Sequence, residues 1–286
     1  MNSPLGAYYL IMMIKIFSSL NIAVLKSVRY ISHSLFPIPH SQKLLTSSVL
    51  GLSLLITPAA LADYQPPDDP QRPSDYTGQA GSRDGCAGGG MPLTALVPLT
   101  HVGQTVSTRP TLAWLVPDNT RKPMELRLHE YDSEGTLQPI GEVISLESSP
   151  GIMTFTLPED GLELKVGHTY RWQVAIICDP DQPASDLIAR EDIQVVEKPS
   201  DWENTLSDRA NLSDFYADEG LWYDALQEAL KLAEESGQGE VGSLLEELIT
   251  SEETKINQQE FSERDLKEKK RRIKDLREIA NLEFRI

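Results

Sequence analysis

Alternating apolar and polar residues fill the middle of this chain, and this pattern constrains the fold more than any other feature of the sequence. Between residues 91 and 198, short runs of period two are separated by Gly, Pro, Ser and Asp, as in antiparallel strands joined by turns. We therefore predict a β-sandwich in this part of the chain. The predicted strands cover residues 93–100, 109–117, 124–132, 141–147, 151–159, 168–179 and 190–198.

The longest of these runs, residues 168–179, places Tyr170 and Trp172 on one face, because successive side chains of a strand point to opposite sides. A tyrosine at the entry of a late strand is typical of the tyrosine corner of immunoglobulin-like and fibronectin-like sandwiches. We therefore predict an antiparallel immunoglobulin/fibronectin-like domain over residues 86–199. Its core is expected to include Trp114, Tyr170 and Trp172.

A helical pattern follows the sandwich, so the fold class is α+β in one chain. Tyr216, Gly220, Trp222 and Ala225 match the helix-turn-helix core of a single tetratricopeptide unit within a helical domain, residues 200–253. One such unit cannot bury its apolar face alone. We therefore expect a third helix, or the sandwich as well, to cover the hairpin.

The N-terminal region, residues 1–62, has the features of a secretory leader. Lys43 precedes an apolar run over residues 44–56, and Ala60 and Ala62 have the spacing of a cleavage site. The run is shorter than the roughly 20 residues of a membrane-spanning helix. We expect cleavage after Ala62 and export to the periplasm or the extracellular space. The mature chain is expected not to span a membrane. The alternative is an uncleaved anchor.

Two cysteines, Cys86 and Cys178, are the only ones in the chain. In an exported protein they are most simply one disulfide, and the alternative is two free buried thiols. Two thiols without a Cys-x-x-Cys or Cys/His cluster make a poor metal site. We therefore predict a structural disulfide and no bound metal.

Charge is distributed unevenly along the chain. The net charge of −17 disfavours binding to nucleic acid, because acidic surfaces repel phosphate. Residues 63–85 contain four prolines and are predicted to form a disordered linker. Residues 254–286 are predicted to form a charged helical tail, in which segment 264–277 holds eight Lys or Arg and three acids. This segment is either a solvated helix that is partly docked or weakly coiled, or a contact to an anionic surface.

Several motifs together resemble a cyanobacterial family of exported proteins known as a domain of unknown function. They are the Cys86 glycine loop, Gly167-His168-Thr169-Tyr170-Arg171-Trp172, and the segment from Tyr216 to Leu226. The resemblance spans about residues 86–250 and implies export. It implies no activity and no cofactor.

No residues in the sequence form a recognisable catalytic constellation. His101, His129 and His168 are not paired with a nucleophile and an orienting acid at a known spacing. We therefore expect a non-catalytic interaction or scaffold module of the cell envelope, not an enzyme, whose partner is another envelope protein. Trp202 and Trp222 are candidates for the partner surface. The alternative is an envelope hydrolase or polysaccharide-active enzyme, which a deep pocket with perturbed carboxylates would favour.

Overall fold

In the computed structural model, the described residues all belong to the unit Leu61–Ile286. The predicted leader, residues 1–62, and Cys86 lie outside the described residues. The structure describes residues 64–74, 78–80, 91–117, 121–198, 202, 212–236 and 240–282.

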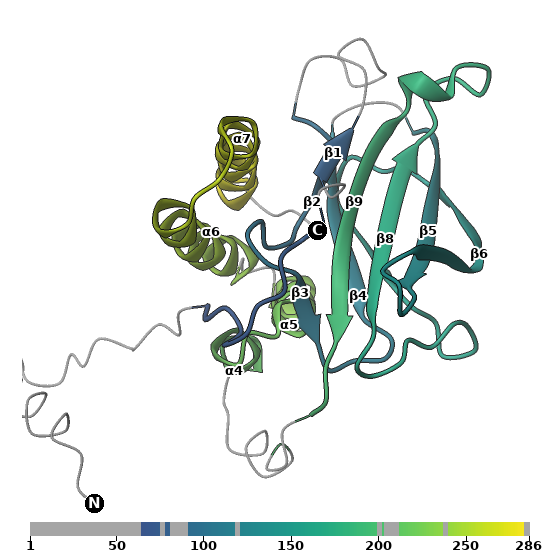
Figure 1. Ribbon diagram of the computed structural model, residues 1–286. Coiled ribbons are helices and arrows are strands. Elements are labelled where there is room, and N and C mark those ends of the chain that lie inside the picture. The colour runs from purple at the N-terminus through teal and green to yellow at the C-terminus, as the bar shows by residue number, and fades with distance from the viewer. Residues whose placement is uncertain are drawn as a thin grey trace, which may run out of the picture. The chain divides into compact units, whose positions relative to one another are not determined.

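Nine strands of the described chain form two sheets (Figure 1). The larger sheet has the order β1-β9-β8-β5-β6, with β3 parallel to β9, and the smaller sheet has the order β2-β4-β7. All other pairings are antiparallel. The strands are β1 (Gly78–Ala80), β2 (Thr94–Ala95), β3 (Gly103–Thr105), β4 (Thr111–Val116), β5 (Pro123–Tyr131), β6 (Leu137–Glu147), β7 (Gly151–Thr156), β8 (Thr169–Ile176) and β9 (Leu187–Val195).

Each of the seven predicted runs overlaps a strand, because the alternation of apolar residues marks the face that is buried. On β8, Tyr170, Trp172, Val174 and Ile176 are at most 3% exposed and point inward. The strands β1 and β3 were not predicted, because three residues each are too few for a periodic pattern.

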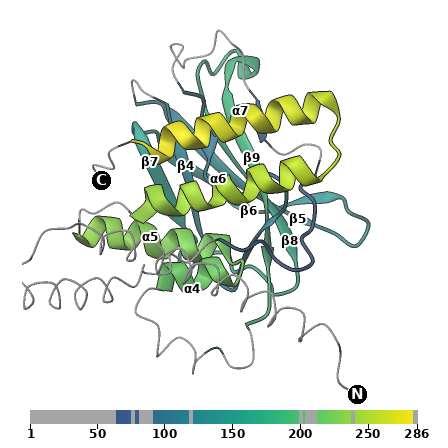
Figure 2. The same ribbon diagram turned by 90° about the vertical axis from the view of Figure 1, so that its left-hand side faces the viewer.

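Among the described residues, the helices α4 to α7 follow the strands and cover one side of them. Figure 2 shows α7, α6, α5 and α4 stacked from top to bottom in front of the strands. A 3-10 turn, η2 (Pro183–Ser185), precedes β9. The α-helices are α4 (Leu212–Asp218), α5 (Trp222–Ser236), α6 (Glu240–Gln258) and α7 (Glu263–Ala280).

One hydrophobic core contains side chains from both sheets and from the helices. The rings of Trp114 on β4 and Trp172 on β8 lie 6.2 Å apart, so the two sheets pack against each other. The indole N–H of Trp172 donates to the hydroxyl of Tyr223 on α5 at 2.9 Å, and the indole N–H of Trp222 donates to the carbonyl of Leu96 at 2.8 Å. Strands and helices therefore depend on a shared interior.

The α+β class is confirmed, whereas an immunoglobulin-like sandwich and a tetratricopeptide-like hairpin are not. The larger sheet is mixed, because β3 runs parallel to β9, and the smaller sheet has only three strands. The hydroxyl of Tyr170 does accept a hydrogen bond from the backbone N–H of Lys165 at 2.9 Å, as a tyrosine corner would.

The prediction of a disordered linker over residues 63–85 is wrong for the part that the structure describes. Tyr64 is 1% exposed, and its hydroxyl lies 2.8 Å from Nε2 of His101. The N–H of Gln65 donates to the carbonyl of Ala217 at 3.0 Å. Few aliphatic residues led to the linker prediction, but one aromatic anchor and backbone hydrogen bonds hold this segment against the helices.

The boundary predicted after residue 253 falls inside α6, which runs from Glu240 to Gln258. The following helix, α7, buries Ile273, Leu276 and Ile279 in the common core. These residues recur at helical spacing, so α7 is an integral layer of the fold.

Candidate functional site

An open pocket of about 910 Å³ lies between the C-terminal half of α7 and the adjoining ends of β4 and β7. Ligand pockets commonly have volumes of roughly 300–1,000 Å³, so its size is suited to a small molecule or a few side chains. We call it the α7 pocket. It is lined by Met91, Leu115, Val116, Pro117, Pro150, Gly151, Lys274, Arg277, Glu278, Asn281 and Leu282.

The sequence places apolar groups on the floor of the α7 pocket and charges at its rim. Register pairs Val116 of β4 with Gly151 of β7, so the two strand ends lie side by side. Because Ile273, Leu276 and Ile279 face the core, Lys274 and Arg277 are left on the outer side of α7. The result is an apolar floor, in which Leu115 and Val116 are buried, beneath two exposed cations.

The rim cations Lys274 and Arg277 each form a weak, exposed ion pair. Nζ of Lys274 lies 3.5 Å from the carboxylate of Glu278, and Nη2 of Arg277 lies 3.0 Å from that of Glu253. All four side chains are at least 45% exposed. Exposed pairs of this kind contribute only about 0–1 kcal/mol, so both cations can exchange their present partners for an anionic ligand.

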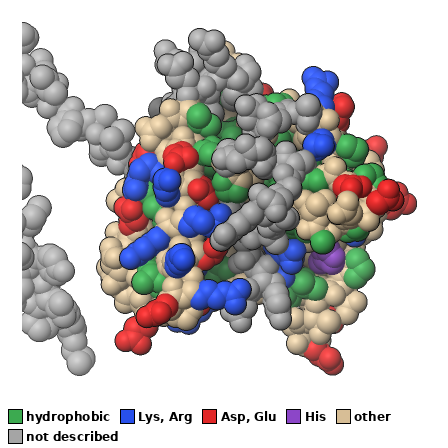
Figure 3. All heavy atoms as spheres, turned by 90° about the horizontal axis from the view of Figure 1, so that it is seen from above, with side chains coloured by type: hydrophobic (Ala, Val, Ile, Leu, Met, Phe, Trp, Pro, Cys, Tyr) green, Lys and Arg blue, Asp and Glu red, His purple; other side chains and the backbone are tan. Residues whose placement is uncertain are grey.

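Basic side chains continue along the outer side of α7 beyond the pocket. Figure 3 shows Lys and Arg side chains gathered over this helix, with acidic side chains among them. On this helix the exposed cations are Arg264, Lys267, Lys270, Arg271, Lys274 and Arg277.

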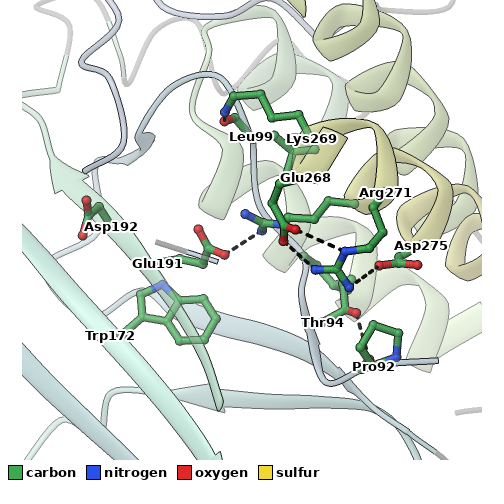
Figure 4. A network of polar contacts seen from close by, with 12 residues as sticks. Pro92, Thr94, Leu99, Trp172, Glu191, Asp192, Glu268, Lys269, Arg271 and Asp275 are labelled. Carbon is green, nitrogen blue, oxygen red and sulfur yellow. Dashed lines mark hydrogen bonds and ion pairs between the residues drawn. The ribbon is translucent and has the colours of Figure 1, made fainter. Parts of the chain in front are cut away.

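A network of polar contacts fixes α7 against the strands (Figure 4). Nη2 of Arg272 lies 2.6 Å from the carboxylate of Glu191 on β9, and both side chains are buried. Burial raises the pKa of Glu191 to about 7, although Arg272 acts in the opposite direction. Nζ of Lys269 donates to the carbonyl of Leu99, which joins the helix to the segment after β2. These contacts position α7, and with it the rim of the pocket.

A second buried cluster resembles a proton relay in outline. Nδ1 of His101 lies 3.3 Å from the carboxylate of Glu252, and Nε2 lies 2.8 Å from the hydroxyl of Tyr64. Burial, followed by the charge of Glu252, raises the pKa of Tyr64 well above its usual value, so this hydroxyl keeps its proton. All three residues are at most 3% exposed, and none lines the α7 pocket. The cluster therefore anchors the N-terminal segment to α6.

The strand β7 forms the outer edge of the smaller sheet beside the pocket. The N–H of Leu157 donates to the carbonyl of Pro110, and the N–H of Leu96 donates to that of Ala113. Because hydrogen-bonding direction alternates along an antiparallel ladder, Ile152 and Thr154 direct their backbone groups away from β4. In the part of the chain that the structure describes, no strand pairs with this side of β7.

The structure places most of the predicted site residues in the interior. Trp114, Tyr170, Trp172, Trp222 and Ala225 are at most 1% exposed. Tyr216 is half-buried, and Gly220 ends the turn between α4 and α5 with a φ of +75°.

The expectation that Trp202 and Trp222 form a partner surface is wrong, because the two side chains are 6% and 0% exposed. Trp202 packs on the ring of Phe215 at 5.2 Å, and Trp222 packs edge-on against Tyr64 at 5.3 Å. Cys178 is half-buried and lies two residues after β8, and its pairing with Cys86 stays a prediction.

Sequence reasoning missed the α7 pocket. Its residues come from positions 91, 115–117, 150–151 and 274–282, which no local pattern connects. The only signal in the sequence was the basic segment 264–277, whose last cations form the rim.

The described residues contain neither a membrane-spanning helix nor a metal-binding cluster. Within them, no helix is long and apolar enough to cross a membrane. Nor do three His, Cys, Asp or Glu side chains in these ranges come together in a way that could hold a metal ion.

The fold and the site define an α+β protein with two packed sheets, a helical layer on one side and an open, cation-rimmed apolar pocket. A family model described as Domain of Unknown Function (DUF928) matches residues 78–261, which is more than half of the chain. The chain therefore belongs to the DUF928 family.

Other comparisons add little. No curated protein matches this chain. The crystal structure of Bacteroides uniformis beta-glucuronidase is similar over 41% of this chain and 14% of that chain, with 13% identity and a TM-score of 0.20. The matched part is thus a small fraction of the glucuronidase, and a likeness this distant carries no argument about function.

Proposed function

We propose that this protein is an exported, non-catalytic interaction module of the cell envelope, which binds another envelope protein through the α7 pocket. The observation that carries the proposal is the pocket itself, with its apolar floor and its exposed rim cations Lys274 and Arg277. Apolar cavities with a few convergent polar groups are the usual form of binding sites. Export rests on the leader pattern before Ala62.

The polar groups of the pocket suit binding better than acid–base chemistry. Glu278 is the one carboxylate in the lining, and it is exposed and paired with Lys274. The buried carboxylates Glu191 and Glu252 are engaged beneath the helices. The pocket therefore offers anchoring contacts: apolar burial on the floor and charge recognition at the rim.

The test is a comparison of variants in a pull-down. The mature chain from residue 63 onward is immobilised and exposed to solubilised envelope proteins, with Lys274→Glu/Arg277→Glu as the pocket variant. Lys267→Glu/Lys270→Glu is the control, because it makes the same charge change on the same helix outside the pocket lining.

We expect one protein species to be retained by the wild type and by the control, and lost from the pocket variant. Circular dichroism should show that both variants remain folded, since exposed pairs contribute little to stability. Retention of the same species by all three chains would contradict the proposal.

A further inference from the structure

We infer that the partner binds as an extended segment that adds to the outer edge of β7, places an apolar side chain in the α7 pocket and brings acidic residues to Lys274 and Arg277. This inference rests on the proposed function and specifies how the same site recognises its partner. Strand addition of this kind takes affinity from main-chain hydrogen bonds and specificity from pockets for alternate side chains.

The backbone of β7 is arranged to accept a further strand. Ile152, Thr154 and Thr156 direct their N–H and C=O groups away from β4, since the intervening residues pair with it. Thr154 and Thr156 are exposed, and Ile152 is half-buried. This edge therefore presents a row of donors and acceptors to the surface.

The edge strands β6 of the larger sheet and β7 of the smaller sheet differ in how they are protected against pairing. The edge strand β6 contains Pro139, Gly141 with a φ of +67°, exposed Glu142, and a register shift opposite β5. Proline, bulges and charges are the usual devices that prevent edge-to-edge association. The sequence of β7, Gly-Ile-Met-Thr-Phe-Thr, has no proline, no charged residue and no register shift opposite β4, and its one positive-φ residue, Gly151 with a φ of +100°, stands at the first position of the strand. The contrast marks the β7 edge as a surface for pairing.

The pocket lies where an added strand would deliver a side chain. Leu115, on the pocket floor, is the register partner of Ile152, and Gly151 at the start of β7 lines the pocket directly. Because side chains of a strand alternate between faces, every second residue of an added segment points toward the helix side. An apolar residue at such a position enters the pocket beneath Lys274 and Arg277.

The charge distribution of the protein indicates that the partner segment is acidic. The chain carries a net charge of −17, and the exposed cations of α7 are the local exception. A basic partner segment would be attracted by most of the surface without preference for this edge, whereas an acidic one is repelled elsewhere and held at the rim. The same net charge opposes pairing of two β7 edges from two copies of this chain.

The test uses two blocked peptides, DVTLTD and KVTLTK, which differ only in the charge of their ends. Each is titrated into the mature chain while the amide signals of Ile152 and Thr154 are followed by NMR and hydrogen exchange. We expect DVTLTD to protect these amides and to bind about tenfold more tightly than KVTLTK, as two weak charge pairs allow. Failure of DVTLTD to protect either amide, or equal binding of the two peptides, would overturn the inference.

Variants then separate the backbone contribution from the charge contribution. Thr154→Pro removes an outward N–H without removing a hydrogen bond to β4, and Thr154→Val keeps that N–H. We expect the proline variant to lose the peptide and the valine variant to retain it. If Thr154→Pro is poorly folded, Thr156→Pro provides the same test at the next outward position. In Lys274→Glu/Arg277→Glu, the preference should reverse in favour of KVTLTK.

The outcomes distinguish this inference from the proposed function. If the pull-down partner depends on Lys274 and Arg277 but is retained by Thr154→Pro, pocket binding stands and strand addition is wrong. A dimer of the protein alone that Thr154→Pro converts to a monomer would overturn the inference in favour of a second copy as the occupant.

Discussion

Asp224 illustrates how single buried polar residues join the helices to the strands. It lies on α5, is 8% exposed, and its Oδ2 accepts a hydrogen bond from the N–H of Val106 at 3.1 Å. Burial is the main cause that raises the pKa of Asp224 to about 6. Its ionisation therefore opposes folding at neutral pH, although its hydrogen bond supports the fold.

The pH dependence of stability should report this carboxyl. The pKa of Asp224 is higher in the folded protein, about 6, than in the unfolded chain, 3.8. Protonation of Asp224 therefore stabilises the folded state fully below pH 3.8, and this stabilisation is lost as the pH rises through about 6. Relative to Asp224→Asn, the unfolding free energy of the wild type should fall by about 2 kcal/mol between pH 4 and pH 7.

Urea unfolding of both chains at several pH values measures this difference, with the exposed Asp160→Asn as the control. A difference between wild type and Asp224→Asn that stays constant or grows with pH would show that Asp224 is not protonated preferentially in the folded state.

Sequence reasoning at this scale worked for residues whose partners lie on the same strand. Tyr170 and Trp172 were expected in the core because the alternation of β8 fixes their side, and both are at most 1% exposed. The exposure of Trp202 and Trp222 was predicted wrongly, since it depends on Phe215 and Tyr64, which pack on them from other segments.

At the scale of elements, the N-terminal segment and the turn between α4 and α5 fit closely together. Gly220 has a φ of +75°, and a Cβ at this position would lie 3.0 Å from the carbonyl oxygen of Gln65 and from the nitrogen of Pro67. Gly135 has the same φ of +75°, but a Cβ there would have no neighbour within 4 Å. A side chain at either position would therefore strain the backbone equally, but only a side chain at Gly220 would also collide with the N-terminal segment.

Replacing each glycine by alanine separates these two effects. Gly135→Ala should lower the unfolding free energy by about 1 kcal/mol through strain alone. Gly220→Ala should cost about 1–3 kcal/mol more, because the methyl group must displace the N-terminal segment. Thermal or urea unfolding measures both. Equal costs for the two variants would indicate that residues 64–74 do not dock on this turn.

For the basic helix α7, the sequence pattern predicts the helix but not the residues that it packs against. Its apolar stripe was visible at residues 266, 273, 276 and 280, so a helix was expected. Partial docking was considered, but its partner could not be predicted, because the buried ion pair joins Arg272 to Glu191, which are 81 positions apart. No local signal indicates that this arginine, among eight Lys or Arg in 264–277, is the buried one.

At the scale of the whole molecule, the predicted disulfide would join the segment before β2 to the end of β8. In the chain-entropy model, closing a loop of this length stabilises the fold by about 4–5 kcal/mol. Cys178→Ser and Cys86→Ser should each lower stability by a similar amount, and the double variant should lose no more than either one.

Peptide mapping without reduction is the direct measurement of this bond. It should yield one linked pair of peptides containing Cys86 and Cys178. Alkylation of both thiols in protein purified without reductant would contradict the prediction.

The class of the fold was accessible from the sequence because strand and helix periodicities are local. The pocket was not, because it arises where four separate parts of the chain meet, and its function as a site depends on which charges of α7 remain outside. The order of strands in the two sheets was equally out of reach, since β3 joins β9 in parallel across about 90 residues.

The central claim, that the α7 pocket is where an envelope partner binds, is tested most directly by photo-crosslinking in cells. The photoreactive residue p-benzoylphenylalanine is introduced at Leu282 in the pocket lining, which is 45% exposed, or at Val143 on the protected edge β6, which is 48% exposed. The account predicts a discrete crosslinked product with one envelope protein from position 282 and none from position 143. The same products from both positions, or no product from position 282, would contradict it.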